Sequence, residues 1–94
     1  MLFMVIERFR DHDAEAAYRR FHRRGRMLPK GVTFHGSWVS ADLGRCFQLM
    51  ACDDVSLLQL WVSAWSDLVA FEIVPVAPGE AVAQTLAADE PESA

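Results

Sequence analysis

The chain alternates between extended apolar runs and helical patterns in an order that few folds can accommodate. The predicted elements are a strand at 2–9, a helix at 14–25, strands at 32–39 and 45–52, a helix at 55–67 and a strand at 69–76. Because parallel crossover connections are right-handed, this order favours an α+β, ferredoxin-like βαββαβ fold. The four strands then form an antiparallel sheet of order 4-1-3-2, with both helices on one face.

Each predicted helix has a start signal. Asp11 or Asp13 precedes the first helix and Asp53 or Asp54 the second, as N-caps whose side chains accept backbone hydrogen bonds. Gly25 is suited to end the first helix, because glycine readily adopts C-cap conformations. The second helix repeats apolar residues three and four apart, at Leu57, Leu58, Trp61, Ala64, Trp65 and Leu68.

The run Arg45–Cys52 is the strand predicted to be most buried, although it carries a glutamine in its middle. A polar side chain inside an apolar strand needs a hydrogen-bond partner or a ligand. A tight turn at residues 40–44 predicts three pairs across the hairpin: Trp38 with Phe47, Ser37 with Gln48, and His35 with Met50. Gln48 then has a polar neighbour on the adjacent strand.

Alternation along the strands separates a nearly apolar set from a set that contains polar residues. The apolar set is expected to face the helices and consists of Leu2, Met4, Ile6, Phe34, Trp38, Phe47, Leu49, Phe71 and Ile73. The second set, on the helix-free face, consists of Phe3, Val5, Glu7, His35, Ser37, Cys46, Gln48, Met50, Glu72 and Val74. Since the first and last strands are antiparallel neighbours, Glu7 and Glu72 are expected side by side.

The chain is short for so apolar a composition. It has 94 residues, of which 52% are hydrophobic, and a sheet with helices on one face leaves the other face uncovered. A second copy packed sheet to sheet would bury that face, so we expect a homodimeric α/β barrel. Residues 1–78 form the barrel domain. Residues 79–94 form a C-terminal extension that is partly helical or disordered, with a helical turn expected at 81–86.

Several classes of protein do not fit the sequence. No apolar run approaches the roughly 20 residues of a membrane-spanning helix, and no signal-peptide pattern occurs, so a cytoplasmic protein without a membrane partner is expected. Cys46 and Cys52 lie too far apart on one strand for a disulfide and are expected as buried thiols. No metal-ligand spacing and no nucleotide-binding motif occurs, so neither a metal nor another cofactor is expected.

Five of the nine basic residues cluster between Arg19 and Arg26, whereas the whole chain has a net charge of −4. Domains that bind nucleic acid usually carry net positive charge, so nucleic acid is not expected as a partner. The cluster has the chemistry to hold an anion. However, arginines spread around a helix more often keep its surface solvated.

Several segments resemble a family of unknown function. They are Met1–Phe9, Gly25–Pro29, Ser37–Trp38, Arg45–Met50 and Asp67–Val76. As a set, over about residues 1–78, they resemble domain-of-unknown-function family 3303, whose members are short, mostly bacterial proteins. The resemblance implies the fold of the ferredoxin-like dimeric α/β barrels and a homodimer. Barrel relatives include cofactor-independent monooxygenases, haem-degrading enzymes, small-ring isomerases and stress-response proteins, and no motif in this chain selects among them.

The candidate ligand-binding residues are polar members of the second set and two tryptophans. They are Glu7, His35, Ser37, Gln48, Glu72, Trp61 and Trp65. Of two adjacent carboxylates, one holds its proton more tightly, which suits general acid–base chemistry. The leading hypothesis is a homodimer that binds a small organic molecule in the barrel interior.

Each candidate also has a structural interpretation. The two glutamates suit a solvated rim with arginine partners, and His35 and Gln48 suit hydrogen-bonded positions in a core or an interface. Trp61 and Trp65 lie on a helix stripe of the kind that normally packs into the core. Two alternatives therefore stay open: a non-catalytic structural or regulatory dimer, and a cofactor-independent monooxygenase- or isomerase-like enzyme. Enzymatic activity is left undecided, and no catalytic residue is assigned.

Overall fold

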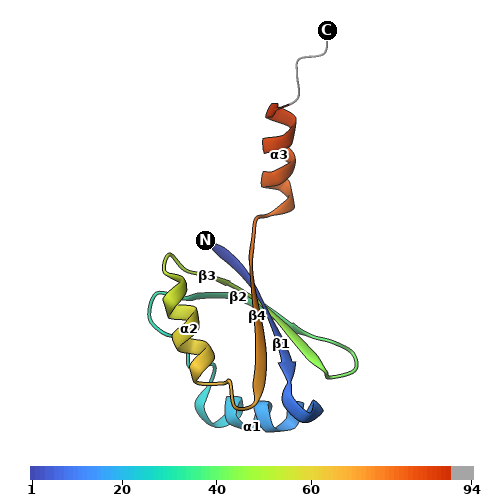
Figure 1. Cartoon of the computed structure of the whole chain (residues 1–94), viewed down its shortest axis with the longest axis vertical. Helices are drawn as coiled ribbons and strands as arrows, with labels where there is room; N and C mark the ends of the chain where they lie inside the picture. Colours follow the sequence, from blue (N-terminus) through green and yellow to red (C-terminus); the bar gives the residue numbers. More distant parts are fainter. Residues whose placement is uncertain (90–94) are drawn as a thin grey trace.

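A computed structural model describes residues 1–89 of the chain. The elements are β1 (Leu2–Phe9), η1 (Arg10–His12), α1 (Ala14–Arg24), β2 (Thr33–Val39), β3 (Arg45–Ala51), α2 (Val55–Ser63), β4 (Val69–Val76) and α3 (Gly79–Asp89). All strand pairs are antiparallel, in the order β2-β3-β1-β4, and Figure 1 shows the arrangement. The predicted α+β fold and strand order are therefore confirmed. Within residues 1–89, no helix has the length and apolar character to cross a membrane.

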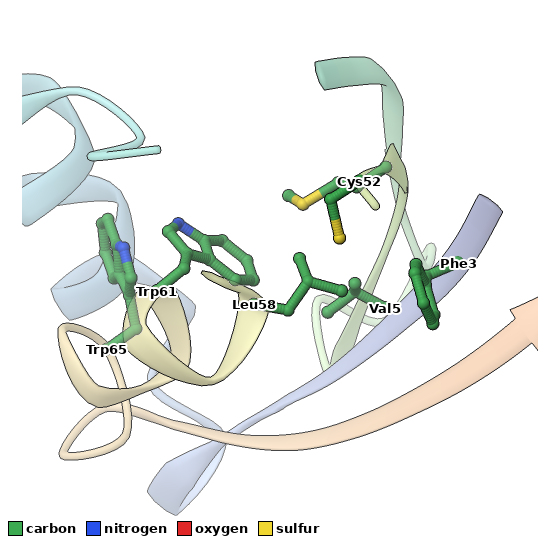
Figure 2. Packing of buried hydrophobic residues seen from close by; sticks show 7 residues of the cluster. Phe3, Val5, Cys52, Leu58, Trp61 and Trp65 are labelled. Atoms are coloured by element: carbon green, nitrogen blue, oxygen red, sulfur yellow. The ribbon is translucent and has the colours of Figure 1, made fainter. Parts of the chain in front are cut away.

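The core lies between the sheet and the two helices α1 and α2, in two clusters. The larger cluster joins β1 and β3 to α2 and the turn after it, through Phe3, Val5, Met50, Cys52, Leu58, Trp61 and Trp65 (Figure 2). The smaller cluster joins the sheet to α1, through Phe9, Ala14, Ala17, Cys46 and Val69. Because a fully buried large apolar side chain contributes about 1.5–3 kcal/mol, these clusters hold both helices on the same face of the sheet.

The strand faces differ from the prediction. On β1 and β3 the residues under the helices are Phe3, Val5, Glu7, Cys46, Gln48 and Met50, and their alternates Leu2, Met4, Ile6, Phe47 and Leu49 lie on the uncovered face. The expectation that the cleaner apolar set faces the helices was wrong for these two strands. On β4 it was right, because Phe71 and Ile73 pack against the core. Alternation separates two sets of residues but does not tell which set the helices cover.

The β2–β3 hairpin has the predicted register near its turn only. Trp38 pairs with Phe47 and Ser37 with Gln48, as expected. Beyond them Phe34, not His35, is opposite Met50, because the register shifts between Phe34 and Gly36. A bulge of this kind places one extra residue on one strand, so side chains before and after it change faces. Phe34 therefore packs against the core, whereas Trp38 lies on the uncovered face.

The helix ends follow from local hydrogen bonds. Asp13 caps α1 by accepting from the Ala16 amide, and Asp54 caps α2 by accepting from the Ser56 amide. The second helix ends at Ser63, earlier than predicted, because the next amides donate three residues back and tighten the chain into turns. These turns lead directly into β4.

Helix α3 is longer than the predicted helical turn at 81–86. It follows β4 and projects away from the sheet and the other helices, and residues 81–87 are exposed (Figure 1). The expected division of the chain at residue 78 stays a prediction. The part of the expected tail at residues 90–94 lies outside the described residues.

Candidate functional site

Two polar side chains are buried under the helices and contact each other. Glu7 on β1 is 6% exposed and Gln48 on β3 is 7% exposed. Glu7 is opposite Cys46 and Gln48 is opposite Val5, so the two side chains are diagonal neighbours on one face. Gln48 Nε2 donates a hydrogen bond to Glu7 Oε1. The hydrogen-bond partner of Gln48 is therefore the carboxyl group of Glu7 on the adjacent strand β1.

Arg26, in the loop after α1, extends this pair into a row of three side chains. Its Nε donates to Gln48 Oε1 at 2.9 Å, so the amide of Gln48 links the guanidinium to the carboxyl. The guanidinium carbon of Arg26 lies 3.7 Å from the ring centre of Phe34 and 5.0 Å from that of Phe21. Stacking on aromatic rings and one directional hydrogen bond hold the guanidinium in one orientation.

The two tryptophans of the candidate list hold the backbone of this loop. The Arg26 carbonyl oxygen accepts from Trp61 Nε1 at 2.8 Å and from Trp65 Nε1 at 3.1 Å. In Figure 2 the two indole rings stand next to each other beside the end of α2. Because an indole N–H that leaves water needs an acceptor, both tryptophans depend on this one carbonyl group. Their aromatic rings are buried in the core, so the loop is fixed to α2, which carries Trp61, and to the turn after it, which carries Trp65.

The loop has an unusual backbone on both sides of Arg26. Gly25 ends α1 with φ +69° and ψ −164°, and its amide donates to the Phe21 carbonyl at 2.7 Å. Met27 has φ +59°, which is uncommon for a residue with a side chain. Such conformations persist only where the surroundings impose them, and they concentrate at functional sites. Here the two indole hydrogen bonds to Arg26 provide the constraint.

A bidentate ion pair supports the same region from α1. Arg20 donates from Nη1 and Nη2 to the two carboxylate oxygens of Asp67, at 2.7 Å each, and from Nη1 to the Ala64 carbonyl at 3.1 Å. Its guanidinium carbon lies 5.7 Å from the Trp65 ring centre. Both charged groups face solvent, so the pair matters here as a geometric link between α1 and the turn that carries Trp65.

Burial sets the protonation of the site. Desolvation raises the pKa of Glu7 from 4.5 to about 7, against the opposing effects of the Gln48 hydrogen bond and the Arg26 charge. Burial, together with the neighbouring Glu7 carboxyl, raises the pKa of Cys46 to about 12. Cys46 is therefore a thiol rather than a nucleophilic thiolate at neutral pH. Glu7, in contrast, exchanges a proton near neutral pH, which a general acid or base requires.

The three polar side chains face a cavity of about 180 Å³. Its other lining residues come from β1, α1, β2, β3 and the region of α2: Phe9, Ala17, Tyr18, Phe21, Ser37, Cys46, Trp61 and Trp65. Tyr18 and Phe21 are 46% and 37% exposed, and Ser37 is exposed as well. These three residues therefore form the mouth of the cavity, and Glu7 lies at its buried end. The free and buried Cys46 confirms the expected thiol.

The structure brings together five of the seven candidate residues. Glu7, Ser37, Gln48, Trp61 and Trp65 line the cavity, whereas His35 and Glu72 do not. His35 is exposed at the bulge in β2. The expected neighbouring pair of glutamates was wrong: Glu72 is opposite Ile6 on the uncovered face, and Glu7 is opposite Phe71. A register displaced by one residue puts the two carboxyl groups on opposite faces.

Sequence reasoning missed Arg26 as a member of the site. Arg26 was counted in the basic cluster that keeps α1 solvated, but it lies beyond the end of that helix. A signal was available, because Gly25 ends the helix and Arg26 follows it within Gly25–Pro29, one of the segments on which the family resemblance rests. Sequence reasoning also did not name Tyr18 and Phe21, the aromatic lining that comes from α1, as candidates.

No cluster of three or more histidine, cysteine, aspartate or glutamate side chains suited to a metal ion occurs within residues 1–89. Comparison with curated proteins and with solved structures gave no match. A family model described as "Domain of unknown function (DUF3303)" matches residues 1–90, which is nearly the whole chain and includes α3. The chain therefore belongs to the DUF3303 family.

Proposed function

We propose that this protein is a homodimer that binds a small organic molecule in the cavity between the sheet and the helices α1 and α2. The observation that carries the proposal is the row Arg26–Gln48–Glu7, which brings a cation, an amide and a carboxyl group to one aromatic-lined cavity. Small-molecule sites are typically concave and largely apolar, with a few converging polar groups.

The cost of burying Glu7 supports a functional role. Raising its pKa from 4.5 to about 7 corresponds to roughly 3 kcal/mol of stability lost above neutral pH. A glutamine at this position would keep an acceptor for Gln48 without that cost. Buried groups that reduce stability in this way are concentrated at binding and catalytic sites.

The three tryptophans offer a direct test by ¹H–¹⁵N NMR. Trp61 and Trp65 line the cavity, whereas Trp38 is 57% exposed on the other face of the sheet. A library of small uncharged and charged fragments is titrated into the labelled protein. Binding in the cavity should shift the indole signals of Trp61 and Trp65 and leave that of Trp38 unchanged. If no fragment shifts the two site indoles, the polar row is structural and the proposal is wrong.

A second candidate function is general acid–base catalysis on the bound molecule, as in an isomerase-like enzyme. The observation that favours it is the pKa of Glu7 near 7, beside a cavity that admits a ligand. Glu7 would move a proton between two atoms of the ligand while Arg26 holds it. For any fragment that binds, proton exchange with ²H₂O is measured by NMR. Glu7→Gln should abolish the exchange and retain binding, and equal exchange in both proteins would exclude this role.

The homodimer is proposed through the uncovered face of the sheet. Its central rows are aliphatic or aromatic, with Leu2, Met4 and Ile6 on β1 beside Phe47 and Leu49 on β3. Trp38 and Val74 extend the same face onto the two edge strands. An apolar surface of this extent is unfavourable in water. A second copy of the chain is the simplest partner, because a two-fold symmetric interface packs the same apolar surface of each subunit against the other.

A further inference from the structure

The guanidinium of Arg26 retains two unused donor groups at the cavity. Its Nε is bonded to Gln48 and its face lies on Phe34. Neither Nη1 nor Nη2 forms a hydrogen bond or an ion pair with any residue in the described part of the chain. Arg20 differs in this respect, since both of its terminal nitrogens are bonded to Asp67. Arg26 thus presents a fixed cationic group whose outer donors are free for a ligand.

Glu7 retains an unused oxygen as well. Oε1 accepts from Gln48, and no described residue donates to Oε2. Among the described residues, every fully enclosed side-chain nitrogen or oxygen has a hydrogen-bond partner. It follows that Oε2 is not fully enclosed, and the open volume next to Glu7 is the cavity. The site therefore offers two separated polar positions, a cationic one at Arg26 and a carboxyl one at Glu7.

We infer that the ligand is a small planar monocarboxylate of about one ring, with its carboxylate on Nη1 and Nη2 of Arg26 and its ring between the aromatic walls. This inference rests on the proposed binding function and specifies the ligand class. Guanidinium and carboxylate groups match as paired, parallel hydrogen bonds, which a lysine or an amide donor does not reproduce. A hydroxyl or carbonyl group on the ring would reach Glu7 Oε2.

The dimensions and the lining agree with this class. A cavity of about 150 Å³ holds a benzene-sized molecule, and this one measures about 180 Å³. The walls include Tyr18, Phe21, Trp61 and Trp65, and aromatic side chains pack well against an aromatic or conjugated ring.

The charge of the site favours a monoanion. Among the lining residues, Arg26 carries the positive charge and Glu7 is the acidic residue. With Glu7 protonated, one carboxylate neutralises Arg26. A dianion such as phosphate would leave a net negative charge in a largely apolar site, at a cost set by desolvation.

The test compares benzoate with benzamide, which has the same shape and no charge, by calorimetric titration and by the indole signals. We expect benzoate to bind at least about tenfold more tightly than benzamide, and to shift Trp61 and Trp65 but not Trp38. Arg26→Gln should weaken benzoate by at least about tenfold, because a desolvated charge pair is lost, and should leave benzamide unchanged. Arg26→Lys keeps the charge without the planar fork and should fall between the two.

The matched control is Arg23→Gln, which removes a charge from an exposed position on α1 near Arg26 in the chain. It should bind benzoate like the wild type. Equal affinity for benzoate and benzamide, wild-type affinity in Arg26→Lys, an equal loss in Arg23→Gln, or tighter binding of inorganic phosphate would each overturn the inference. If neutral fragments shift the site indoles and benzoate does not bind, the carboxylate inference fails while the proposed function stands. If Arg26→Gln does not fold, Arg26→Lys decides the question.

Discussion

The two faces of the sheet differ in what covers them and in the residues they carry. Under α1 and α2, β1 and β3 place the buried pair Glu7 and Gln48 among apolar neighbours. On the other face, the middles of the same two strands present half-buried aliphatic and aromatic residues, and no helix within residues 1–89 covers them. A sheet with one solvated face normally shows the opposite arrangement, with polar residues outside.

The polar pair on the covered face and the apolar residues on the open face point to different roles for the two faces. Polar groups under the helices cost stability and converge on a cavity, which is typical of a ligand site. Exposed apolar side chains on the open face lower solubility, and burying them against a partner surface is favourable, which is typical of an interface. The strands therefore separate two roles by alternation: one side chain faces the cavity and the next faces the proposed partner. Four predictions test this separation, from the largest expected effect to the smallest.

The largest effect on stability should come from truncating Trp61, a core residue that lines the cavity. Trp61→Ala deletes a side chain that is 2% exposed, packs edge-on against Phe71 and holds the Arg26 carbonyl. We expect a loss of about 3–5 kcal/mol in the free energy of unfolding, measured in urea at fixed protein concentration. The loss should not depend on protein concentration, because the contacts lie within one chain.

Trp38→Ala is the matched control on the open face. It should cost less than about 1 kcal/mol in dilute solution, where Trp38 is largely exposed. Its cost should rise with protein concentration if the open face is an interface. A Trp38→Ala loss as large and as concentration-independent as that of Trp61→Ala would contradict the assignment of the two faces.

The next effect concerns Glu7 and pH. The folded protein keeps Glu7 protonated up to about pH 7, whereas the unfolded chain ionises it near pH 4.5. This term is absent below pH 4.5, lowers stability progressively between pH 4.5 and 7, and is complete above pH 7. Glu7→Gln removes it while keeping an oxygen for Gln48, so the variant should be more stable than the wild type by about 3 kcal/mol at pH 8.

The measurement is urea unfolding of both proteins from pH 4 to 8, and the difference between the two curves cancels the other carboxylates. Asp42, Asp54 and Asp67 have lowered pKa values, from their hydrogen bonds to Ser40, Ser56 and Arg20 respectively, and occur in both proteins. Their effect has the opposite sign and falls in a more acidic range. A difference that stays constant across this pH range would show that Glu7 titrates normally.

A third prediction concerns the open face alone. Leu49→Lys places a charge at the centre of the uncovered rows, opposite Met4 and beside Gly36. We expect the dissociation constant of the dimer to rise about 100-fold, which is about 2.7 kcal/mol, because a lysine would be desolvated without a partner. Sedimentation equilibrium measures this shift. The indole signals of Trp61 and Trp65 should keep their wild-type positions, and a monomeric wild type would refute the interface.

The smallest effect should come from His35, which alternation placed in the same set of strand residues as Glu7. His35 is exposed at the bulge and does not line the cavity. His35→Ala should change the free energy of unfolding by less than about 0.5 kcal/mol and leave ligand binding as in the wild type. A clear loss of fragment binding in this variant would return His35 to the site.

Much of the fold followed from local patterns. The strands at 2–9 and 69–76 have the predicted limits, and Asp13 and Gly25 act as the predicted caps of α1. These features depend on residues near in sequence, through backbone propensity and short-range hydrogen bonds. The predictions fail where a shift of one residue in strand pairing moves a side chain to the other face of the sheet. The bulge at His35 and the pairing of Glu72 with Ile6 each change a face. Gly36 was the local signal of the bulge, since a glycine inside a strand often marks one, whereas the register of Glu72 is set only by pairing between distant strands.

The candidate site shows the same division. Gln48 and Glu7 could be singled out from the sequence, because a polar residue in an apolar strand is anomalous wherever the strand lies. Arg26 was not, since an arginine in a basic cluster is ordinary and its one distinguishing signal was its position just after Gly25, the predicted end of the helix. Only the turn after α1 brings it over β3, where Gln48 accepts from its Nε.

By itself, the sequence determined most of the helices and strands, their order, and the presence of polar side chains within the apolar central strands. Periodicity and composition are enough for this, because they act within a few residues. The tertiary structure decided which strand face the helices cover, which carboxyl group reaches the cavity and which arginine joins it. These outcomes depend on packing between residues far apart in the chain, such as Arg26 with Gln48 at 22 positions and Glu7 with Gln48 at 41, and alternation cannot encode them.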